Sequence, residues 1–163
     1  MEFNIGAIQK LTSPNPFALI STTKEDGSTN LMALSWWTYA SNRPATVAVC
    51  LSKKGLSGGL IHENGEFGLN IVDETLAQAA FGCGTCSGRT ANKAEQFGIE
   101  LMEPDTIKTR LVSAHKVAME CRLVSEIEVA DHIMYIAEVV SAHVKPEAKA
   151  VFAFEGYGKL ASI

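Results

Sequence analysis

The sequence predicts a mainly β fold, a β-barrel with a few short helices between its strands. Several short apolar runs follow one another, separated by tight turns. Two longer runs, 117–129 and 133–144, predict a pair of extended strands. The chain shows no regular alternation of strand and helix, so a parallel βαβ sheet describes it less well. A barrel also leaves few strand edges unpaired.

The first part of the chain is expected to hold a short helix and a β-hairpin. Residues 5–11 predict a helix or a docking arm that stops before Pro14, because proline and the residue preceding it resist helix. Residues 17–23 and 28–34 predict two strands. The Asp26–Gly27 dipeptide between them is typical of a hairpin turn, so we expect the two strands to pair.

The next part predicts two further strands and a helix. The strands are 46–51, which follows a turn at Arg43–Pro44, and 66–71. Residues 57–64 predict a short helix, with Ser57 as its N-cap and Gly65 as its stop.

Residues 76–81 and 93–97 predict two more helical segments, and the glycine-rich stretch 82–89 between them is too irregular for a helix or a strand.

In the strand predicted over 117–129, apolar and charged residues alternate with a period of two, which gives the strand one apolar face and one charged face. The apolar face comprises Val117, Met119, Cys121, Leu123, Ile127 and Val129; the charged face comprises Glu120, Arg122, Glu126 and Glu128. Residues 133–144 are apolar on both faces, so we expect one face to line the core and the other to be covered by a helix or a second subunit.

Length, composition and charge favour a single globular domain over residues 1–163. The 163 residues are 47% hydrophobic and 20% charged, which is ordinary for one domain and short for two. A net charge of −4 gives no basic excess, so neither nucleic acid nor membrane is an expected partner. The N-terminus has no basic, apolar leader, and no apolar run approaches the ~20 residues of a membrane helix. With four cysteines and no export signal, we expect a cytoplasmic protein with reduced thiols.

Two stretches are candidates for binding an anion. Ser52 and Lys53 lead into the helix expected at Ser57, and helix N-termini present free N–H groups that favour phosphate. On spacing alone, a solvated turn with an ordinary N-cap is the more common outcome. The second stretch holds Ser87, Arg89 and Lys93 among small residues, and a mobile surface loop is its alternative.

Trp36, Trp37 and His132 are candidates for contact with an aromatic ligand. If the chain is extended at the two tryptophans, they point to opposite sides, so that one fills the core and the other covers a ligand or a second subunit. Packing of both in the core is the alternative. His132 follows Asp131 at the break between the two long strands, where an imidazole can donate to a ligand or relay a proton; the alternative is a plain turn histidine.

Cys83 and Cys86 form one CxxC motif, which is half of a zinc site, and no second pair follows it. We therefore expect no metal, and we favour a structural pair of thiols over dithiol catalysis, because the βαβ setting of a thioredoxin-type motif is not evident. A regulatory disulfide beside a redox ligand is a further alternative. The chain lacks GxGxxG after a strand, Walker A, HExxH and GxSxG motifs. A nicotinamide cofactor would therefore not be held by a Rossmann fingerprint.

Taken together and in order, several pieces of the chain resemble the flavin reductase-like, FMN-binding split-barrel family, which includes flavoredoxins and ferric reductases. The resemblance extends from about Phe17 to Val144. Its pieces are 17–23, the turn with 26–30, 33–36, 42–49, 65–70, Ser87–Arg89 with Lys93, and Asp131–His132 before 137–139. Leu56, Asn92 and the Cys83/Cys86 pair depart from the pattern of the family.

The resemblance implies a Greek-key split β-barrel, a homodimer, and FMN near the dimer interface. It implies that one group of residues lies along the isoalloxazine and ribityl chain: Asn30, Met32, Ala33, Ser35 and Trp36. It implies a second group near the phosphate: Leu51, Ser52, Lys53 and Ser57. It suggests that Ser87, Arg89 and Lys93 approach FMN from the other side, and it assigns His132 a position near the flavin.

Two functions are compatible with this resemblance. In the first, an enzyme passes electrons from NAD(P)H through FMN to free flavin, ferric iron or a protein acceptor, with His132 placing the nicotinamide or supplying a proton. In the second, an electron-transfer protein retains its FMN and has no nicotinamide activity of its own. A non-redox binding module on the same barrel is a third, weaker alternative.

Overall fold

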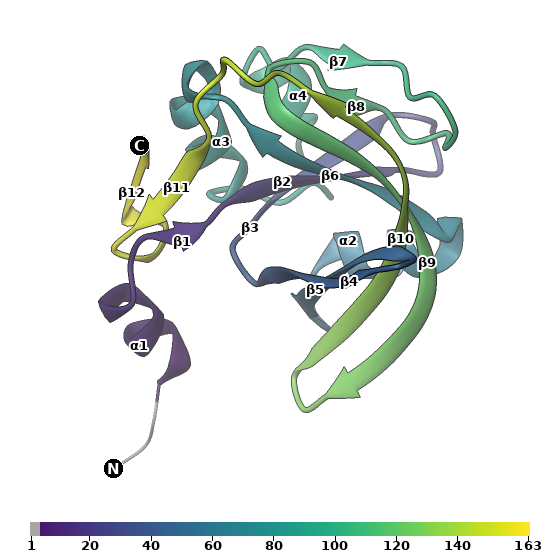
Figure 1. Ribbon diagram of the computed structural model, residues 1–163, viewed down its shortest axis with the longest axis horizontal. Coiled ribbons are helices and arrows are strands. Elements are labelled where there is room, and N and C mark those ends of the chain that lie inside the picture. The colour runs from purple at the N-terminus through teal and green to yellow at the C-terminus, as the bar shows by residue number, and fades with distance from the viewer. Residues whose placement is uncertain (1–3) are drawn as a thin grey trace.

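The computed structural model describes residues 4–163 and is dominated by one seven-stranded antiparallel sheet, in the order β3-β2-β6-β9-β10-β5-β4. The mainly β prediction is confirmed; Met1–Phe3 of the expected domain lie outside the described residues. The strands of this sheet are β2 (Ala18–Thr23), β3 (Thr29–Leu34), β4 (Trp37–Asn42), β5 (Ala45–Ser52), β6 (Glu66–Val72), β9 (His115–Val129) and β10 (His132–Val144). Figure 1 shows the sheet curving back on itself around the buried core, with β9 and β10 as its longest strands.

Short elements complete the fold. The helices are α1 (Ile5–Leu11), α2 (Leu56–Asn64), α3 (Ala77–Cys83) and α4 (Lys93–Gln96), with 3-10 turns η1 (Glu74–Leu76) and η2 (Gly156–Gly158). A three-stranded sheet contains β1 (Asn15–Pro16), β11 (Val151–Phe154) and β12 (Lys159–Ser162), and a two-stranded sheet contains β7 (Leu101–Met102) and β8 (Leu111–Val112). Across residues 4–163, the helices are too short or too polar to span a bilayer.

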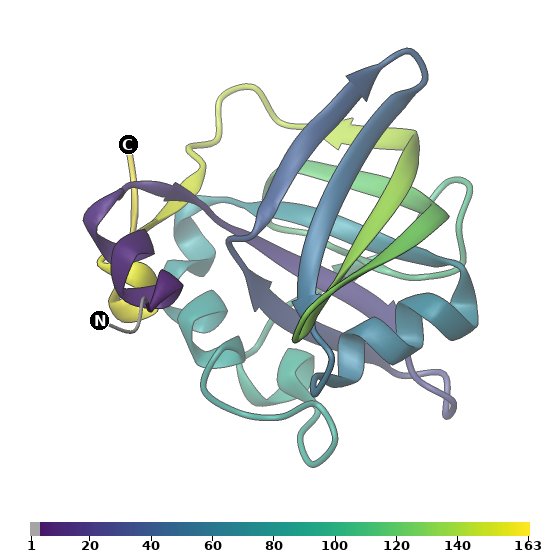
Figure 2. The ribbon, with the colours of Figure 1, turned by 90° about the horizontal axis from the view of Figure 1, so that it is seen from below.

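The curvature of the main sheet follows from how β3 and β4 are connected. These strands lie at opposite edges of the sheet, yet only Ser35 and Trp36 separate them in the chain. The two edges must therefore meet at this corner, which is visible in Figure 2 where β3 and β4 converge. Two register shifts between β9 and β10 also bend the sheet. The observed sheet thus curls as the predicted barrel requires.

Strand β2 is buried on both faces. Ala18 and Ile20 pack into the cluster inside the curled sheet, whereas Leu19 packs into a second cluster with residues of α3 and β11. All three side chains are fully buried. A strand buried on both sides reads as a continuous apolar run, which explains why 17–23 shows no alternation in the sequence.

Several expectations about elements need correction. Trp37 begins β4, a strand that the sequence did not predict, and β1, β11 and β12 were not predicted either. The N-cap of α2 is Gly55, whereas Ser57 lies buried in the first turn. The stop at Gly65 is confirmed by its left-handed backbone, with φ of 67°.

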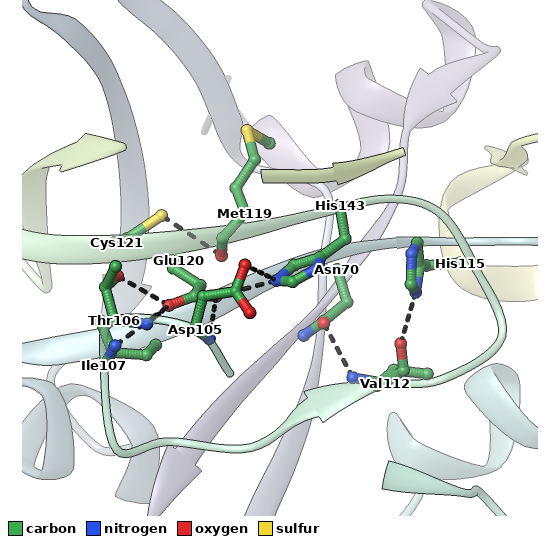
Figure 3. Close-up of polar contacts among 10 residues, drawn as sticks. All are labelled: Asn70, Asp105, Thr106, Ile107, Val112, His115, Met119, Glu120, Cys121 and His143. Carbon is green, nitrogen blue, oxygen red and sulfur yellow. Dashed lines mark hydrogen bonds and ion pairs between the residues drawn. The ribbon is translucent and has the colours of Figure 1, made fainter. Parts of the chain in front are cut away.

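The faces of β9 also differ from the expected pattern. Ile127 and Val129, placed on the buried face by periodicity, are nearly half exposed because this end of β9 runs past β6, which pairs only with residues 115–122, and has β10 alone as its neighbour (Figure 1). Glu120, placed on the charged face, is completely buried. Figure 3 shows its carboxylate surrounded by backbone N–H groups and His143.

Gly68 in β6 is required by close packing. A Cβ at this position would overlap the Oγ of Ser21 and lie 2.6 Å from Cδ2 of Leu111. Both neighbours are fully buried and cannot move aside easily. We expect Gly68→Ala to lower the free energy of unfolding by about 2 kcal/mol, the usual size of overpacking effects.

Urea unfolding of Gly68→Ala measures this effect, with Gly59→Ala as the matched control. Gly59 lies exposed in α2 and an added Cβ there would meet no atom within 4 Å. The control should gain roughly 0.5–1 kcal/mol, because alanine favours helix over glycine. Equal midpoints for the two variants would contradict the packing argument.

Candidate functional site

An open pocket of about 870 Å³ lies where three distant segments meet. Lys24 comes from the turn between β2 and β3, Lys53 and Gly55 come from the link between β5 and α2, and Gly88 and Arg89 come from the loop after α3. The last two segments are the two stretches whose sequences predict separate anion sites. The structure brings them to the walls of one pocket.

The N-terminus of α2 opens on this pocket. Gly55 is its N-cap, makes no side-chain capping bond, and is followed by a first turn without acidic residues. The first N–H groups of a helix have no partner within the helix and carry partial positive charge. The nine-residue helix therefore offers donors to an anion at the position where Lys53 and Arg89 also lie.

The charges around the pocket are mixed, but most of the groups already have partners. The Nζ of Lys53 lies 3.3 Å from Oε1 of Glu128. Arg89 Nη1 donates to the carbonyl of Lys54 (3.3 Å), so its guanidinium is held against the segment that leads into α2. Asp26 also lines the pocket, but its Oδ1 accepts bonds from the N–H (2.9 Å) and Oγ (2.6 Å) of Ser28 in the hairpin turn.

Behind the pocket wall, Asn30 connects β3 to α2. Its Nδ2 donates to Ser57 Oγ (2.9 Å) and to Thr22 Oγ1 (3.1 Å), and both Asn30 and Ser57 are buried. The backbone of Gly88 passes so close that a Cβ there would overlap Asn30 Oδ1. Lys24 holds this segment through a 3.0 Å bond from its Nζ to the Gly88 carbonyl. These contacts give three candidate segments one fixed arrangement.

His132 and Trp36 stack on each other next to the same link. Their ring centroids are 4.9 Å apart with an interplanar angle of 30°. His132 Nδ1 lies 2.9 Å from Asp131 Oδ1, and the hydrogen bond and charge of His132 lower the pKa of Asp131. His132 pairs with Ser52 across β10 and β5, so the aromatic pair is in register with the residue that precedes Lys53.

The corner between β3 and β4 contains a buried polar atom without a partner. Within residues 4–163, Ser35 Oγ is inaccessible to solvent and makes no hydrogen bond, although the Ser35 N–H donates to the Tyr157 hydroxyl (3.0 Å). Trp37 Nε1 is also buried and makes no hydrogen bond to the described residues. Buried polar groups are normally satisfied, so an unpaired hydroxyl here suits a ligand with polar atoms.

The remaining candidates are placed as follows. Met32 and Trp36 are half-buried against the core inside the sheet, and Ala33 packs on the cluster outside it. Leu51 points into the core and leaves only its backbone for a ligand, while Ser52 is exposed and its Oγ accepts the Lys54 N–H (3.3 Å). Ser87 Oγ accepts the Arg89 N–H (3.2 Å) and so shapes the loop.

Lys93 does not line this pocket. Its Nζ donates to the Cys83 carbonyl (2.6 Å), and only 5% of the residue is exposed. Lys24 and Tyr157, by contrast, take part in the arrangement and were not predicted, and neither was the close approach of Gly88 to Asn30. The basic side chain beside the Asp26–Gly27 turn was the available signal for Lys24; no local pattern marks the other two.

Separate features of these segments suit parts of an FMN molecule, although Ser35, Trp36 and His132 are not among the residues that line the 870 Å³ pocket. The uncapped helix N-terminus with Arg89 and Lys53 suits a phosphate, and the unpaired Ser35 hydroxyl and the Trp36–His132 stack suit a polar, planar ring system. The residues present therefore fit the cofactor implied by the resemblance.

Comparison with curated proteins finds relatives in archaea. An uncharacterized protein of Archaeoglobus fulgidus is 29% identical over 111 residues, 68% of this chain. A ferric-chelate reductase (NAD(P)H) of the same organism is 31% identical over 111 residues, 66% of this chain. The match spans 63% of the length of each relative, so this chain accounts for less than two thirds of either.

Comparison with solved structures finds the same fold. The flavoredoxin of Desulfovibrio vulgaris (Miyazaki F) superposes with a TM-score of 0.85 at 23% identity, covering 100% of this chain and 93% of that one. An FMN-binding protein from Thermus thermophilus gives 0.82 at 20% identity, covering 93% and 87%. Residues 11–161, nearly the whole chain, match the family described as flavin reductase like domain. The chain is therefore a member of the flavin reductase-like family, as its sequence pattern indicated.

Proposed function

We propose that this protein binds FMN and passes electrons from NAD(P)H through it to free flavin, ferric iron or a protein acceptor. The observation that carries the proposal is the pocket in which the uncapped N-terminus of α2 meets Lys53 and Arg89. A phosphate is stabilised by such a combination of N–H donors and cations. The ferric-chelate reductase relative and the FMN-binding structural neighbour support the choice of chemistry.

Each residue of the site has a role in this proposal. Arg89 and the first turn of α2 hold the phosphate. Asn30 orients Ser57 through their 2.9 Å bond and so links β3 to the first turn of α2. Ser35 donates its free hydroxyl to a polar atom of the ring system or ribityl chain. Met32 and Trp36 exclude water from the apolar part of the cofactor.

FMN supplies the redox chemistry, since its isoalloxazine accepts a hydride and can release electrons singly or in pairs. His132 is positioned by Trp36 on one side and by Asp131 on the other. The carboxylate orients the imidazole and favours a proton on Nδ1, which leaves Nε2 to contact a nicotinamide amide or to exchange a proton with water. This gives His132 a positioning role, with Nε2 as a hydrogen-bond acceptor.

A second copy of the chain completes the site in this proposal. Trp37 is half-buried, its indole N–H has no partner among residues 4–163, and the neighbouring Tyr39 is 66% exposed. The two rings touch edge to face, with centroids 5.3 Å apart. An aromatic edge of this kind suits a homodimer interface. Sedimentation of the purified protein measures the stoichiometry.

Anaerobic titration tests the proposed activity. The purified protein should bind one FMN per chain and acquire the absorption of oxidised flavin. Addition of NADH or NADPH should then bleach that absorption. Retention of colour with both nucleotides, together with reduction by a protein donor, would instead favour a carrier like the flavoredoxin neighbour. Protein that remains colourless with excess FMN would refute both functions.

A further inference from the structure

Cys83 and Cys86 have no role in the proposed flavin site. Cys83 is the last residue of α3, and Cys86 follows after Gly84 and Thr85. Both thiols are free. Gly84 packs on β3, because a Cβ there would lie 3.4 Å from the Cβ of Ala33. The pair is therefore fixed against a rigid strand and does not lie in an independent loop.

The backbone around the pair is tightly turned. The N–H of Gly84 donates to the Phe81 carbonyl and that of Thr85 to the Gly82 carbonyl, each at 3.0 Å. Cys86 Sγ lies 3.9 Å from the same Gly82 oxygen, beside the peptide that enters Cys83. The chain therefore turns back between the two cysteines, and Cys86 Sγ and Lys93 Nζ contact the neighbouring carbonyls of Gly82 and Cys83 at the end of α3. A disulfide needs Cα atoms ~4.4–6.8 Å apart, a separation that residues three apart in a tight turn reach.

Lys93 lies beside the cysteine pair. Its ammonium is buried, donates to the Cys83 carbonyl at 2.6 Å, and has no carboxylate within 4 Å among the described residues. A buried cation without an anion is unfavourable. Burial lowers the pKa of Lys93, and the neighbouring Cys83 and Cys86 oppose this shift, so both sulfurs lie close enough to interact with the ammonium.

The two cysteines differ in accessibility. Cys86 is partly exposed, whereas Cys83 is 1% exposed and its burial raises the pKa of its thiol to about 11. Cys86 can therefore meet a reagent from solution, and Cys83 can react only with a sulfur already bound to Cys86. Within residues 4–163, possible metal ligands gather in a group of three only at Asp105, Glu120 and His143, so the cysteine pair is not part of such a group.

We propose that Cys83 and Cys86 form a reversible dithiol–disulfide centre that exchanges with low-molecular-weight disulfides such as oxidised glutathione. The Cys86 thiolate attacks one sulfur of the small disulfide, forms a mixed disulfide and expels one small thiolate, which takes up a proton. Cys83, deprotonated as it attacks, then displaces the second small thiolate from Cys86. The small disulfide gains two electrons and two protons, and the protein gains one Cys83–Cys86 bond.

The test uses the wild-type chain in anaerobic glutathione buffers of increasing oxidised fraction, followed by acid quenching, alkylation and peptide mass mapping. Two of the four cysteines should lose reactivity together, and the linked peptide should join Cys83 to Cys86. Cys50→Ser should behave in the same way, because Cys50 lies apart in β5. Cys83→Ser should stop at a glutathione adduct on Cys86.

Four alkylated thiols at every buffer composition would overturn the proposal. A wild-type adduct on Cys86 that Cys83 never displaces would do the same, as would a link that maps to other cysteines. If Cys83→Ser fails to fold, the wild-type peptide map decides alone. The readout does not depend on FMN, so a failure here leaves the proposed flavin function untouched.

Discussion

Replacing Glu120 with glutamine is expected to lower the free energy of unfolding by about 3–4 kcal/mol, because a buried, fully hydrogen-bonded carboxylate is lost. At about 2–4 °C per kcal/mol for a chain of this size, the melting temperature should fall by roughly 10 °C. Glutamine keeps the volume of the side chain, so the loss measures charge and hydrogen bonding without a cavity.

The reason lies in the donors around Glu120, which Figure 3 shows. Oε1 accepts from the N–H of Asp105 (2.7 Å) and from Nε2 of His143 (2.8 Å). Oε2 accepts from the N–H (2.7 Å) and hydroxyl (2.8 Å) of Thr106 and from the N–H of Ile107 (3.0 Å). An amide NH₂ in place of one oxygen would face donors only. The same contacts fasten the loop before β8 to β9 and β10.

Thermal and urea unfolding of Glu120→Gln measures the loss, with Glu103→Gln as the matched control. Glu103 also accepts from a partner, Arg110 at 2.5 Å, but its side chain is 72% exposed. Exposed ion pairs contribute roughly 0–1 kcal/mol, so the control should unfold almost as the wild type does. Similar midpoints for the two variants would show that the Glu120 contacts do not stabilise the fold.

The same carboxylate makes stability depend on pH. Burial by itself raises the pKa of Glu120, but the hydrogen bonds from Asp105, His143, Thr106 and Ile107 outweigh it and lower the pKa from 4.5 to about 2. The unfolded chain therefore takes up the proton first, and the contribution of Glu120 is complete above about pH 4.5. It should be lost as the pH falls toward 2, by about 3 kcal/mol in total. Urea unfolding across this interval should show the loss in wild type and a smaller one in Glu120→Gln.

Arg89→Glu is expected to weaken FMN binding roughly 30- to 100-fold, about 2–3 kcal/mol, if the proposed phosphate position is correct. The substitution removes a cation that lies beside the N-terminus of α2. It also adds a carboxylate that can accept the same free N–H groups and compete with the phosphate. A negative charge at a helix N-terminus favours the helix, so the fold should be retained.

Fluorescence quenching of FMN measures the affinity of Arg89→Glu, and Arg43→Glu is the control. Arg43 lies exposed in the turn between β4 and β5, and its reversal changes the net charge by the same amount. If the effect of Arg89→Glu is local, Arg43→Glu should bind FMN with nearly wild-type affinity. Equal weakening in both variants would indicate a long-range charge effect, and no weakening in Arg89→Glu would remove Arg89 from the site.

The elements that were predictable are those with strong local signals. The hairpin around Asp26–Gly27 and the stop of α2 at Gly65 follow from turn chemistry that does not depend on distant residues. Strand β4 was missed because its residues, Thr38 among them, are mostly polar and exposed, so no apolar period marks them. Glu120 was placed on the solvent face because the alternation of residues along a strand gives only the side to which each side chain points. It cannot reveal that a distant loop, here residues 105–107, covers that side.

The candidate site was predictable to the extent that it depends on single segments. Helix α2 and the cation Arg89 were identified, and Asn30 with Ser57 turn out to be in direct contact. Lys93 was expected to face the cofactor, but its side chain instead donates to the carbonyl of Cys83, ten residues earlier at the end of α3. The role of Gly88 depends on a close approach to Asn30 across 58 positions of the chain (88 − 30), which no local pattern encodes.

The two-residue connection between β3 and β4 has a consequence for the order of folding. Strands joined so closely usually zip together early as a hairpin, but here β3 pairs with β2, and β4 pairs with β5. Ser35 and Trp36 thus reach their native conformation only when both edges of the sheet, β2–β3 and β4–β5, have formed, which is a late and non-local event. A molecule held at this corner should therefore dissociate when the whole domain unfolds rather than when one end frays, and its occupancy would report global unfolding.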